Sequence, residues 1–348
     1  MDTPLIECVP NISEGRDLEK INCIVNAVTE SSQCIILGVE PDKDYNRTVI
    51  TFAGSPTEVV NGALALIRKS IELLDMRSHV GEHPRLGVVD VCPLVPLRGI
   101  TLEECALLAK SIVEVIAKEY QVPLFLYGAA ATSPTRVMLS ALRKGEYEGL
   151  EARLNGSIST HGDETRYPDA GAKKWSEVVA KSGGITVGAR SILVAYNVNF
   201  NEKDARVSKS VASLVRTSGR VLKSEAGGSV KMQGLLNNVQ GMGVVLDGLG
   251  ISQVSMNLLD VSLCPLHVAF KTCESIAKDH GIEACGSEIV GLVPLSAMLE
   301  AGKFFQPALV EESDLVQAAM DGLGLNTYHQ FVAEDNIIEW AIKKKVNQ

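Results

Sequence analysis

Short apolar runs alternate along the first third of the chain with longer stretches in which apolar positions recur at helical spacing. These patterns predict strands over residues 5–9, 34–39, 48–52, 88–97 and 122–127, and helices over 17–29, 55–76 and 101–120. Ser55 and Pro56 are typical of a helix start, because serine caps free N–H groups and proline fits the first turn. The segment 153–183 is polar and irregular.

The same order of elements returns in the second half of the chain. Strands are predicted over residues 192–197, 238–245, 252–258 and 287–293, and helices over 202–217 and 265–280. The string Leu-Val-Pro-Leu closes corresponding strands at 94–97 and 292–295, which favours an internal duplication. A βαββαβ unit forms a mixed or antiparallel sheet with helices on one face, in the ferredoxin-like manner. The predicted fold class is α/β, and within it α+β, with two such units.

The repeat sets the expected domain boundaries. We expect an N-terminal subdomain over residues 1–184, a C-terminal subdomain over 185–327 and a terminal helical tail over 328–348. A chain of 348 residues, 46% of them hydrophobic, has enough apolar surface for two cores. Because each sheet leaves one face open, a crevice between the two open faces is the expected place for a ligand.

Composition narrows the classes of function. The net charge is −9 and the basic residues form no block, which argues against an extended nucleic-acid interface. No segment approaches 18 uncharged apolar residues, so no membrane span is expected. The eight cysteines are dispersed without a CxxC pair, which indicates free thiols in a reducing compartment. We therefore expect a cytoplasmic protein.

The string His79-Val80-Gly81-Glu82-His83 matches a pattern found in some zinc proteases. That chemistry needs both histidines on one face of a continuous helix. Gly81 lies between them and Pro84 disfavours helical geometry at His83, so no metal is expected. His83 is instead expected in an extended loop, where an imidazole suits proton transfer. A surface turn histidine without function is the alternative.

Several strings, distributed in order over residues 5 to about 345, resemble the glutamate formiminotransferase family. They are Leu5-Ile6-Glu7-Cys8-Val9-Pro10-Asn11-Ile12-Ser13-Glu14-Gly15-Arg16, Asn46-Arg47-Thr48-Val49, Gly81-Glu82-His83-Pro84-Arg85, Gly145-Glu146-Tyr147-Glu148, Gly188-Ala189-Arg190, Ala195-Tyr196-Asn197 and Gly286-Ser287-Glu288-Ile289-Val290-Gly291-Leu292-Val293-Pro294. The resemblance implies two ferredoxin-like subdomains enclosing a central folate tunnel, with His83 as catalytic histidine. It also implies a homodimer that binds N-formiminoglutamate and, as co-substrate, tetrahydrofolate.

The sequence departs from the family pattern at three places. Glu40 stands where an aspartate is usual, and Ala129 replaces an acidic residue. The segment from Gly171 to Gly183 corresponds to the family's folate-contacting loop, but it is longer and carries Lys173 and Lys174. In animals the family's transferase is fused to a cyclodeaminase, and since this chain ends at Gln348 we expect that enzyme to be separate.

The resemblance and the residue types together suggest a mechanism. Nitrogen 5 of tetrahydrofolate attacks the amidine carbon, and His83 acts first as base and then as acid. Glu40 is the candidate carboxylate for the cationic amidine or for orienting His83. Arg47, Arg85 and Arg190 are the candidates for bidentate contacts to the anionic groups of the substrates. The other substrate-binding candidates are Asn46, Lys173 and Lys174, with Gly171 and Gly183 in the folate loop and Asn197 for neutral hydrogen bonds.

Three alternatives stay open at this point. The same site transfers a formyl group from N-formylglutamate, which would use oxyanion rather than amidinium stabilisation. The chain is a folate-binding or sensing module without turnover, which the altered loop and Ala129 would explain. A purely structural protein fits least well, because polar residues gather at predicted strand ends and loops.

Overall fold

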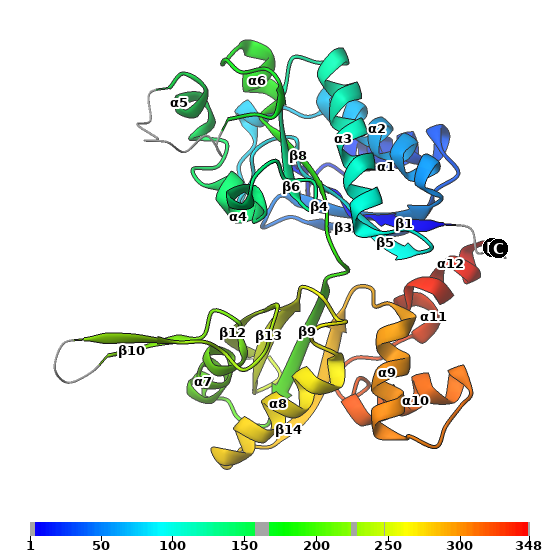
Figure 1. Cartoon of the computed structure of the whole chain (residues 1–348), viewed down its shortest axis with the longest axis vertical. Helices are drawn as coiled ribbons and strands as arrows, with labels where there is room; N and C mark the ends of the chain where they lie inside the picture. Colours follow the sequence, from blue (N-terminus) through cyan, green and yellow to red (C-terminus); the bar gives the residue numbers. More distant parts are fainter. Residues whose placement is uncertain (1–3, 157–166, 224–227, 247, 347–348) are drawn as a thin grey trace. The chain divides into compact units, whose positions relative to one another are not determined.

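The computed structural model describes residues 4–156, 167–223, 228–246 and 248–346. The chain divides into two compact units, Met1–Ser191 and Ile192–Gln348 (Figure 1). Each unit contains its own sheet and its own hydrophobic core. The predicted mixed α/β fold with two subdomains is therefore confirmed.

The first unit begins with the predicted βαββαβ order of elements. These are β1 (Leu5–Cys8), α1 (Leu18–Ser31), β3 (Ile35–Asp42), β4 (Arg47–Gly54), α2 (Pro56–Leu73) and β5 (Val89–Arg98). The strands lie in the order β3-β4-β1-β5 with every neighbouring pair antiparallel, and the short β2 (Asn11–Ile12) pairs with β4 and β5. Ser55 caps α2 by accepting from the Glu58 N–H, and Pro56 follows at the first position, as predicted.

The sheet of the first unit then continues beyond these six elements. Helix α3 (Leu102–Glu119) leads into β6 (Pro123–Gly128), and β8 (Ile185–Ala189) pairs in parallel with both β5 and β6. The sheet ends at β7 (Ala170–Gly171), antiparallel to β6. The boundary expected at residue 184 thus differs from the structure, in which the first unit runs to Ser191. The reason is β8, whose two parallel neighbours both belong to the first unit.

Short helices lie between α2 and β5, after β6, and near both ends of the segment predicted to be irregular. They are η1 (Met76–Ser78), η2 (Pro134–Arg136), α4 (Leu139–Arg143), α5 (Leu150–Leu154) and α6 (Glu177–Ser182). A small cluster of buried residues that includes Leu86, Phe125 and Leu150 lies beneath them. These helices matter for the site because α4 carries Arg143 and the turn before α5 carries Glu146 and Glu148.

The second unit repeats the plan. Its elements are β9 (Val194–Phe200), α7 (Ala205–Val215), β12 (Val239–Leu246), β13 (Ile251–Leu258), α8 (Leu266–Asp279) and β14 (Ala284–Val290). The strand order is β12-β13-β9-β14, again antiparallel throughout. Helices α7 and α8 cover one face of this sheet (Figure 1). Tyr196, Val198 and Phe200 of β9 are fully buried in the core on that face.

The second unit has further elements, of which the sequence patterns predicted only the helical segment from residue 328. A hairpin of β10 (Arg220–Lys223) and β11 (Ser229–Met232) extends from the unit (Figure 1), and four helices follow β14. These are α9 (Leu295–Phe305), α10 (Glu312–Leu323), α11 (Ala333–Asn336) and α12 (Ile338–Val346). The segment expected as a tail from residue 328 packs into the second unit, because Ile337 and Ile338 are buried in its core. None of the helices in the described ranges is long and apolar enough to cross a membrane.

Candidate functional site

His83 lies in the loop between η1 and β5, and no helix includes residues 79–83. Its side chain is half-buried, and the edge of its ring meets Tyr45 at 6.2 Å between ring centroids. Arg47 Nη1 lies 3.2 Å from His83 Nε2. Because a guanidinium can only donate, Nε2 accepts this hydrogen bond and the neutral ring carries its proton on Nδ1. The loop thus presents a neutral imidazole whose basic nitrogen is occupied by Arg47.

The surroundings of His83 keep it neutral. Burial, followed by the charges of Arg47, Arg143 and Arg85, lowers the pKa of His83 to about 4, against a weaker opposing effect of Asp42. The imidazole is therefore unprotonated at neutral pH. That is the form that accepts a proton from a reacting nitrogen.

Arg47 begins β4 and is the cation closest to His83. Its Nη1 also donates to Asn11 Oδ1 at 2.9 Å, while its buried Nε has no hydrogen-bond partner. No carboxylate forms an ion pair with Arg47 in the part of the chain that the structure describes. A half-buried guanidinium without a carboxylate can take an anionic ligand group.

Asn46 forms hydrogen bonds with Gly15, Val80 and His79. Its φ of 49° is in the left-handed region, which asparagine tolerates better than most residues. The side chain accepts from the Gly15 N–H at 3.0 Å and donates to the Val80 carbonyl at 3.0 Å. Its own carbonyl accepts from His79 Nε2 at 2.8 Å. The structure therefore uses Asn46 to join three loops.

Arg85 is also paired with carboxylates of the protein. It is buried, and it forms ion pairs with Glu148 at 2.6 Å and Glu146 at 3.2 Å. Burial opposes ionisation of Glu148, but the hydrogen bonds and charge of Arg85, together with a backbone hydrogen bond, lower the pKa of that carboxyl. A cavity of about 450 Å³ lies here, lined in part by Arg85, Glu146 and Glu148. An anionic ligand at Arg85 would have to compete with these two carboxylates.

His79 does not act together with His83. Its Nε2 donates to the Asn46 carbonyl, and its Nδ1 accepts from Arg85 Nε at 3.3 Å. Both ring nitrogens are thus in use. In the described ranges, no group of three or more His, Cys, Asp and Glu side chains is placed to hold a metal ion.

The sequence analysis missed a buried ion pair between Asp90 of β5 and Arg143 of α4. Asp90 is 1% exposed, and its Oδ1 also accepts from the Leu86 N–H at 3.1 Å. Burial raises the pKa of the Asp90 carboxyl although Arg143 opposes it. The signal was a single carboxylate inside the apolar run of residues 88–97. The pair connects β5 to α4, and Arg143 is one of the charges that act on His83.

The remaining predicted residues of the first unit are dispersed. Glu40 of β3 is exposed, and no hydrogen bond or ion pair joins it to His83 in the described structure. Lys173 and Lys174 are exposed. Arg190 donates to the Ser191 carbonyl at 3.0 Å. Gly171 and Gly183 both have left-handed backbones, with φ of 72° and 64°, so their role in forming the loop is conformational.

Asn197 belongs to the second unit. It is buried on β9 and donates to Glu288 Oε2 at 3.3 Å. It is therefore part of a polar cluster on that sheet.

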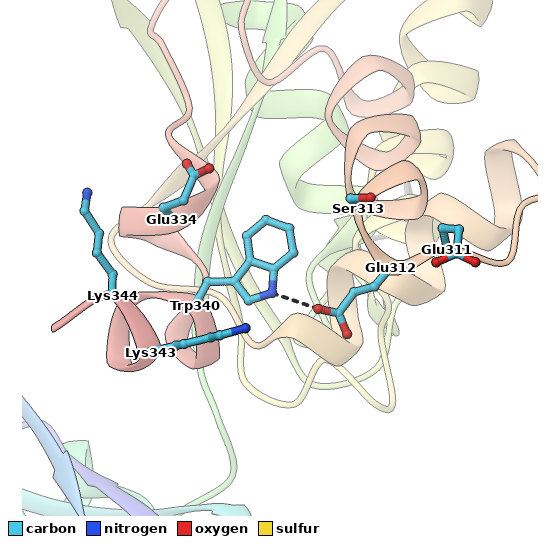
Figure 2. Close-up of a pocket in the computed structure, with 7 residues that line it drawn as sticks. All are labelled: Glu311, Glu312, Ser313, Glu334, Trp340, Lys343 and Lys344. Atoms are coloured by element: carbon cyan, nitrogen blue, oxygen red, sulfur yellow. Dashed lines mark hydrogen bonds between the residues drawn. The ribbon is translucent and has the colours of Figure 1, made fainter. Parts of the chain in front are cut away.

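A further pocket of about 500 Å³ lies among α10, α11 and α12 of the second unit (Figure 2). Trp340 forms its wall and donates from Nε1 to Glu312 at 3.0 Å. The other lining residues are Glu311, Ser313, Glu334, Lys343 and Lys344. The lining includes no histidine, so this pocket does not offer the acid/base group found in the first unit.

Comparison with known protein families accounts for almost the whole chain. Residues 5–190 match the N-terminal subdomain of the formiminotransferase domain, and residues 195–343 match the formiminotransferase domain. The glutamate formimidoyltransferase of Streptococcus pyogenes is 32% identical over 335 residues, which cover 96% of this chain and 99% of that protein. The glutamate formimidoyltransferase of Thermoplasma acidophilum is 35% identical, with 91% and 97% of the two chains covered.

Longer relatives also match. The formimidoyltransferase-cyclodeaminase of Rattus norvegicus is 37% identical over 342 residues, which cover 97% of this chain. The match spans only 60% of the rat protein's length.

Proposed function

Because the chain belongs to the formiminotransferase family, we propose that it transfers the formimino group of N-formiminoglutamate to nitrogen 5 of tetrahydrofolate and releases glutamate. The observation that carries the proposal is the pair formed by His83 and Arg47. It combines a neutral base with a cation that has no carboxylate partner in the described residues. These are the two groups that the transfer of a cationic amidine from an anionic donor requires.

His83 moves the protons. Nitrogen 5 attacks the amidine carbon and forms a new C–N bond, and His83 takes the proton that this nitrogen loses. The bond between the amidine carbon and the glutamate nitrogen then breaks, and His83 returns the proton to the departing glutamate. Holding both substrates in line adds to the rate, and no covalent enzyme intermediate is needed.

Arg47 couples binding to this chemistry. In the structure its N–H occupies the lone pair of His83 Nε2. A substrate carboxylate that draws Arg47 away frees this nitrogen. Burial is the larger cause of the lowered pKa of His83, but the same movement removes the repulsion from Arg47 that adds to it, so that the imidazole becomes more basic when a substrate is present.

Other predicted residues have supporting roles in this proposal. Arg190, Lys173 and Lys174 bind anionic groups of the two substrates, because Arg85 already has two carboxylate partners. Asn46 contributes by positioning Arg47. Gly171 and Gly183 shape the loop that contacts the folate, and Glu40 attracts the cationic amidine through space.

The proposal also covers the location, the oligomeric state and the co-substrate of the enzyme. We place the enzyme in the cytoplasm as a homodimer, with tetrahydrofolate as co-substrate and no metal. A cyclodeaminase activity consumes its product. The proposal involves neither nucleic acid nor a membrane.

The test mixes the purified protein with tetrahydrofolate and N-formiminoglutamate and follows folate absorbance together with released glutamate. We expect the two products in equal amounts. A parallel reaction with N-formylglutamate should be slower, since relatives that match nearly the whole chain are glutamate formimidoyltransferases. Faster turnover of the formyl donor would replace the proposed substrate, and tight folate binding without turnover of either donor would indicate a sensing module. A protein that binds no folate would contradict all three.

A further inference from the structure

The hairpin of β10 and β11, which we call the arm, has one apolar face. In its register Leu222 lies opposite Val230 and Arg220 lies opposite Met232, so these four side chains share one face. Leu222, Val230 and Met232 are 41%, 63% and 40% exposed. Among the described residues, the two strands of the arm pair only with each other (Figure 1). The second unit therefore leaves the apolar face of its own arm in solvent.

The base of the arm is fixed to the second unit. The Gly219 N–H donates to the Arg216 carbonyl at 2.8 Å, and the Leu235 N–H donates to the Leu214 carbonyl at 2.8 Å. Gly219 has a left-handed backbone with φ of 62°, and a Cβ on Gly219 or Gly234 would lie 1.8 Å from a carbonyl oxygen. The arm thus leaves its base in a defined direction. A two-stranded hairpin is only marginally stable in water unless another layer packs on it, so this face requires a cover.

The same unit has an apolar groove beside α8. The groove encloses about 440 Å³, and its lining includes Leu235, Val268, Ile276 and Phe304. Leu235, Val268 and Phe304 are 64%, 38% and 50% exposed. The ring of Phe304 stacks on His267 at 4.5 Å between centroids, which gives the groove a flat aromatic wall. Large apolar side chains that gather in one exposed place mark an interaction surface.

The arm cannot fill the groove of its own copy. Leu235, which lines the groove, follows shortly after Met232, the last residue of β11, so the groove lies beside the base of the arm. The residue pairs of the arm follow one another without a bulge. Each residue advances a strand by about 3.3 Å, so Val230 lies farther from the base than Met232 does. A regular ladder of this kind leads away from the groove and does not turn back onto it.

Two copies related by a two-fold axis satisfy both surfaces at once. The arm of each copy then lies in the groove of the other, and neither an arm nor a groove is left open. A different protein would need both a matching groove and a matching arm, and this chain already carries both. The occupant that fits is therefore a second copy of the chain.

We propose that the chain dimerises by exchange of its arms, with the face of Leu222, Val230 and Met232 packed into the α8 groove of the other copy. The inference rests on the homodimer of the proposed function and names its contact surface. It concerns residues of the second unit alone.

The first test compares two valines of the arm. Val221 and Val230 are 61% and 63% exposed, but they lie on opposite faces of the arm. Val230→Glu should raise the dissociation constant of the dimer about 100-fold or more, because the symmetrical contact then holds two carboxylates in apolar surroundings. Val221→Glu is the matched control and should leave the dimer intact. Sedimentation velocity over a range of concentrations measures the dimer fraction, and thermal unfolding should show that both variants are folded.

The second test asks whether the contact joins arm to groove between copies. Val268→Lys, a change in the groove, should also give a monomer. An equal mixture of Val230→Glu and Val268→Lys should regain the dimer, because the carboxylate of one copy meets the lysine of the other while the second arm and groove are unchanged. A mixture that stays monomeric would overturn the proposed pairing.

The remaining outcomes separate this inference from the proposed function. Val221→Glu and Val230→Glu proteins with equal dimer fractions would overturn the role of the apolar face. A monomeric wild-type protein that turns over N-formiminoglutamate would overturn the arm exchange and leave the transferase standing. A wild-type dimer that depends on Val230 but shows no turnover would support the arm exchange and contradict the proposed function.

Discussion

The two units share a βαββαβ plan but place their polar groups on different parts of it. In the first unit the groups near His83 come from strand ends, a helix and loops, and Arg85 and Arg143 form ion pairs there. In the second unit Asn197, Gln253 and Glu288 lie on adjacent strands, and two of the three are neutral amides. The first unit thus gathers charged groups around one histidine, whereas the second unit holds hydrogen-bonding groups at the fixed spacing of adjacent strands.

The largest effect should follow from His83→Ala. General acid–base catalysis contributes about 100- to 10,000-fold, so kcat should fall by that factor. Tetrahydrofolate should bind as before, because the substitution removes a neutral proton carrier and no charged group. Steady-state kinetics and equilibrium binding measure the two quantities. Equal losses in kcat and in folate affinity would show that His83 contributes to binding rather than to proton transfer.

Asp90→Asn should cause the largest loss of stability. Removing one partner of a buried ion pair leaves the other charge uncompensated and costs about 3–5 kcal/mol. Urea denaturation measures this change. The control is Asp335→Asn, since the ion pair between Asp335 and Lys344 is exposed and such pairs contribute about 0–1 kcal/mol. Similar losses in the two variants would contradict the role given to burial.

Arg47→Met should weaken the use of N-formiminoglutamate. Losing a charged hydrogen bond should lower kcat/KM about 10- to 100-fold. Removing the positive charge also favours the imidazolium, so the pKa of His83 should rise and the acid limb of the pH profile should move to higher pH. Arg47→Lys keeps the charge and serves as the control. An acid limb at unchanged pH in Arg47→Met would show that Arg47 does not lower the pKa of His83.

The smallest effect concerns the wild-type enzyme at mildly acidic pH. Since the pKa of His83 in the free protein is about 4, kcat/KM should remain nearly constant as the pH falls from 8 to about 5. The free energy of unfolding should fall as the pH falls through this range, because the unfolded state binds a proton near the ordinary histidine pKa of about 6.5, whereas folded His83 does not. The stabilising contribution is complete above that value and is lost as the pH falls through about 4. An acid limb near pH 6.5 would contradict the proposed environment.

Sequence patterns predicted the structural features that neighbouring residues determine. The caps of α2 and the extended loop at Pro84 follow from neighbouring residues, and both agree with the structure. The partners of Arg85 could not be predicted from neighbouring residues, because Glu146 and Glu148 lie about sixty positions away along the chain. The roles assigned to Glu40, Lys173 and Lys174 remain predictions.

Strand β8 was missed for a related reason. Its five residues include Gly188, whose missing side chain leaves room for Tyr127 on β6. Such a short run does not stand out as a strand in the sequence. Its two parallel neighbours, β5 and β6, precede it in the chain and were predicted correctly. Pairing between distant strands, rather than local propensity, therefore decides where the first unit ends.

The place of β8 also sets the order of events during synthesis. Strands β5 and β6 each pair in parallel with β8 and leave the ribosome well before it. Until residues 185–189 emerge, the two strands have a gap between them, and their unpaired backbone groups are open to non-native pairing. A nascent or truncated chain that stops at residue 184 would be an aggregation hazard, while one that reaches Ser191 can complete the first unit's sheet.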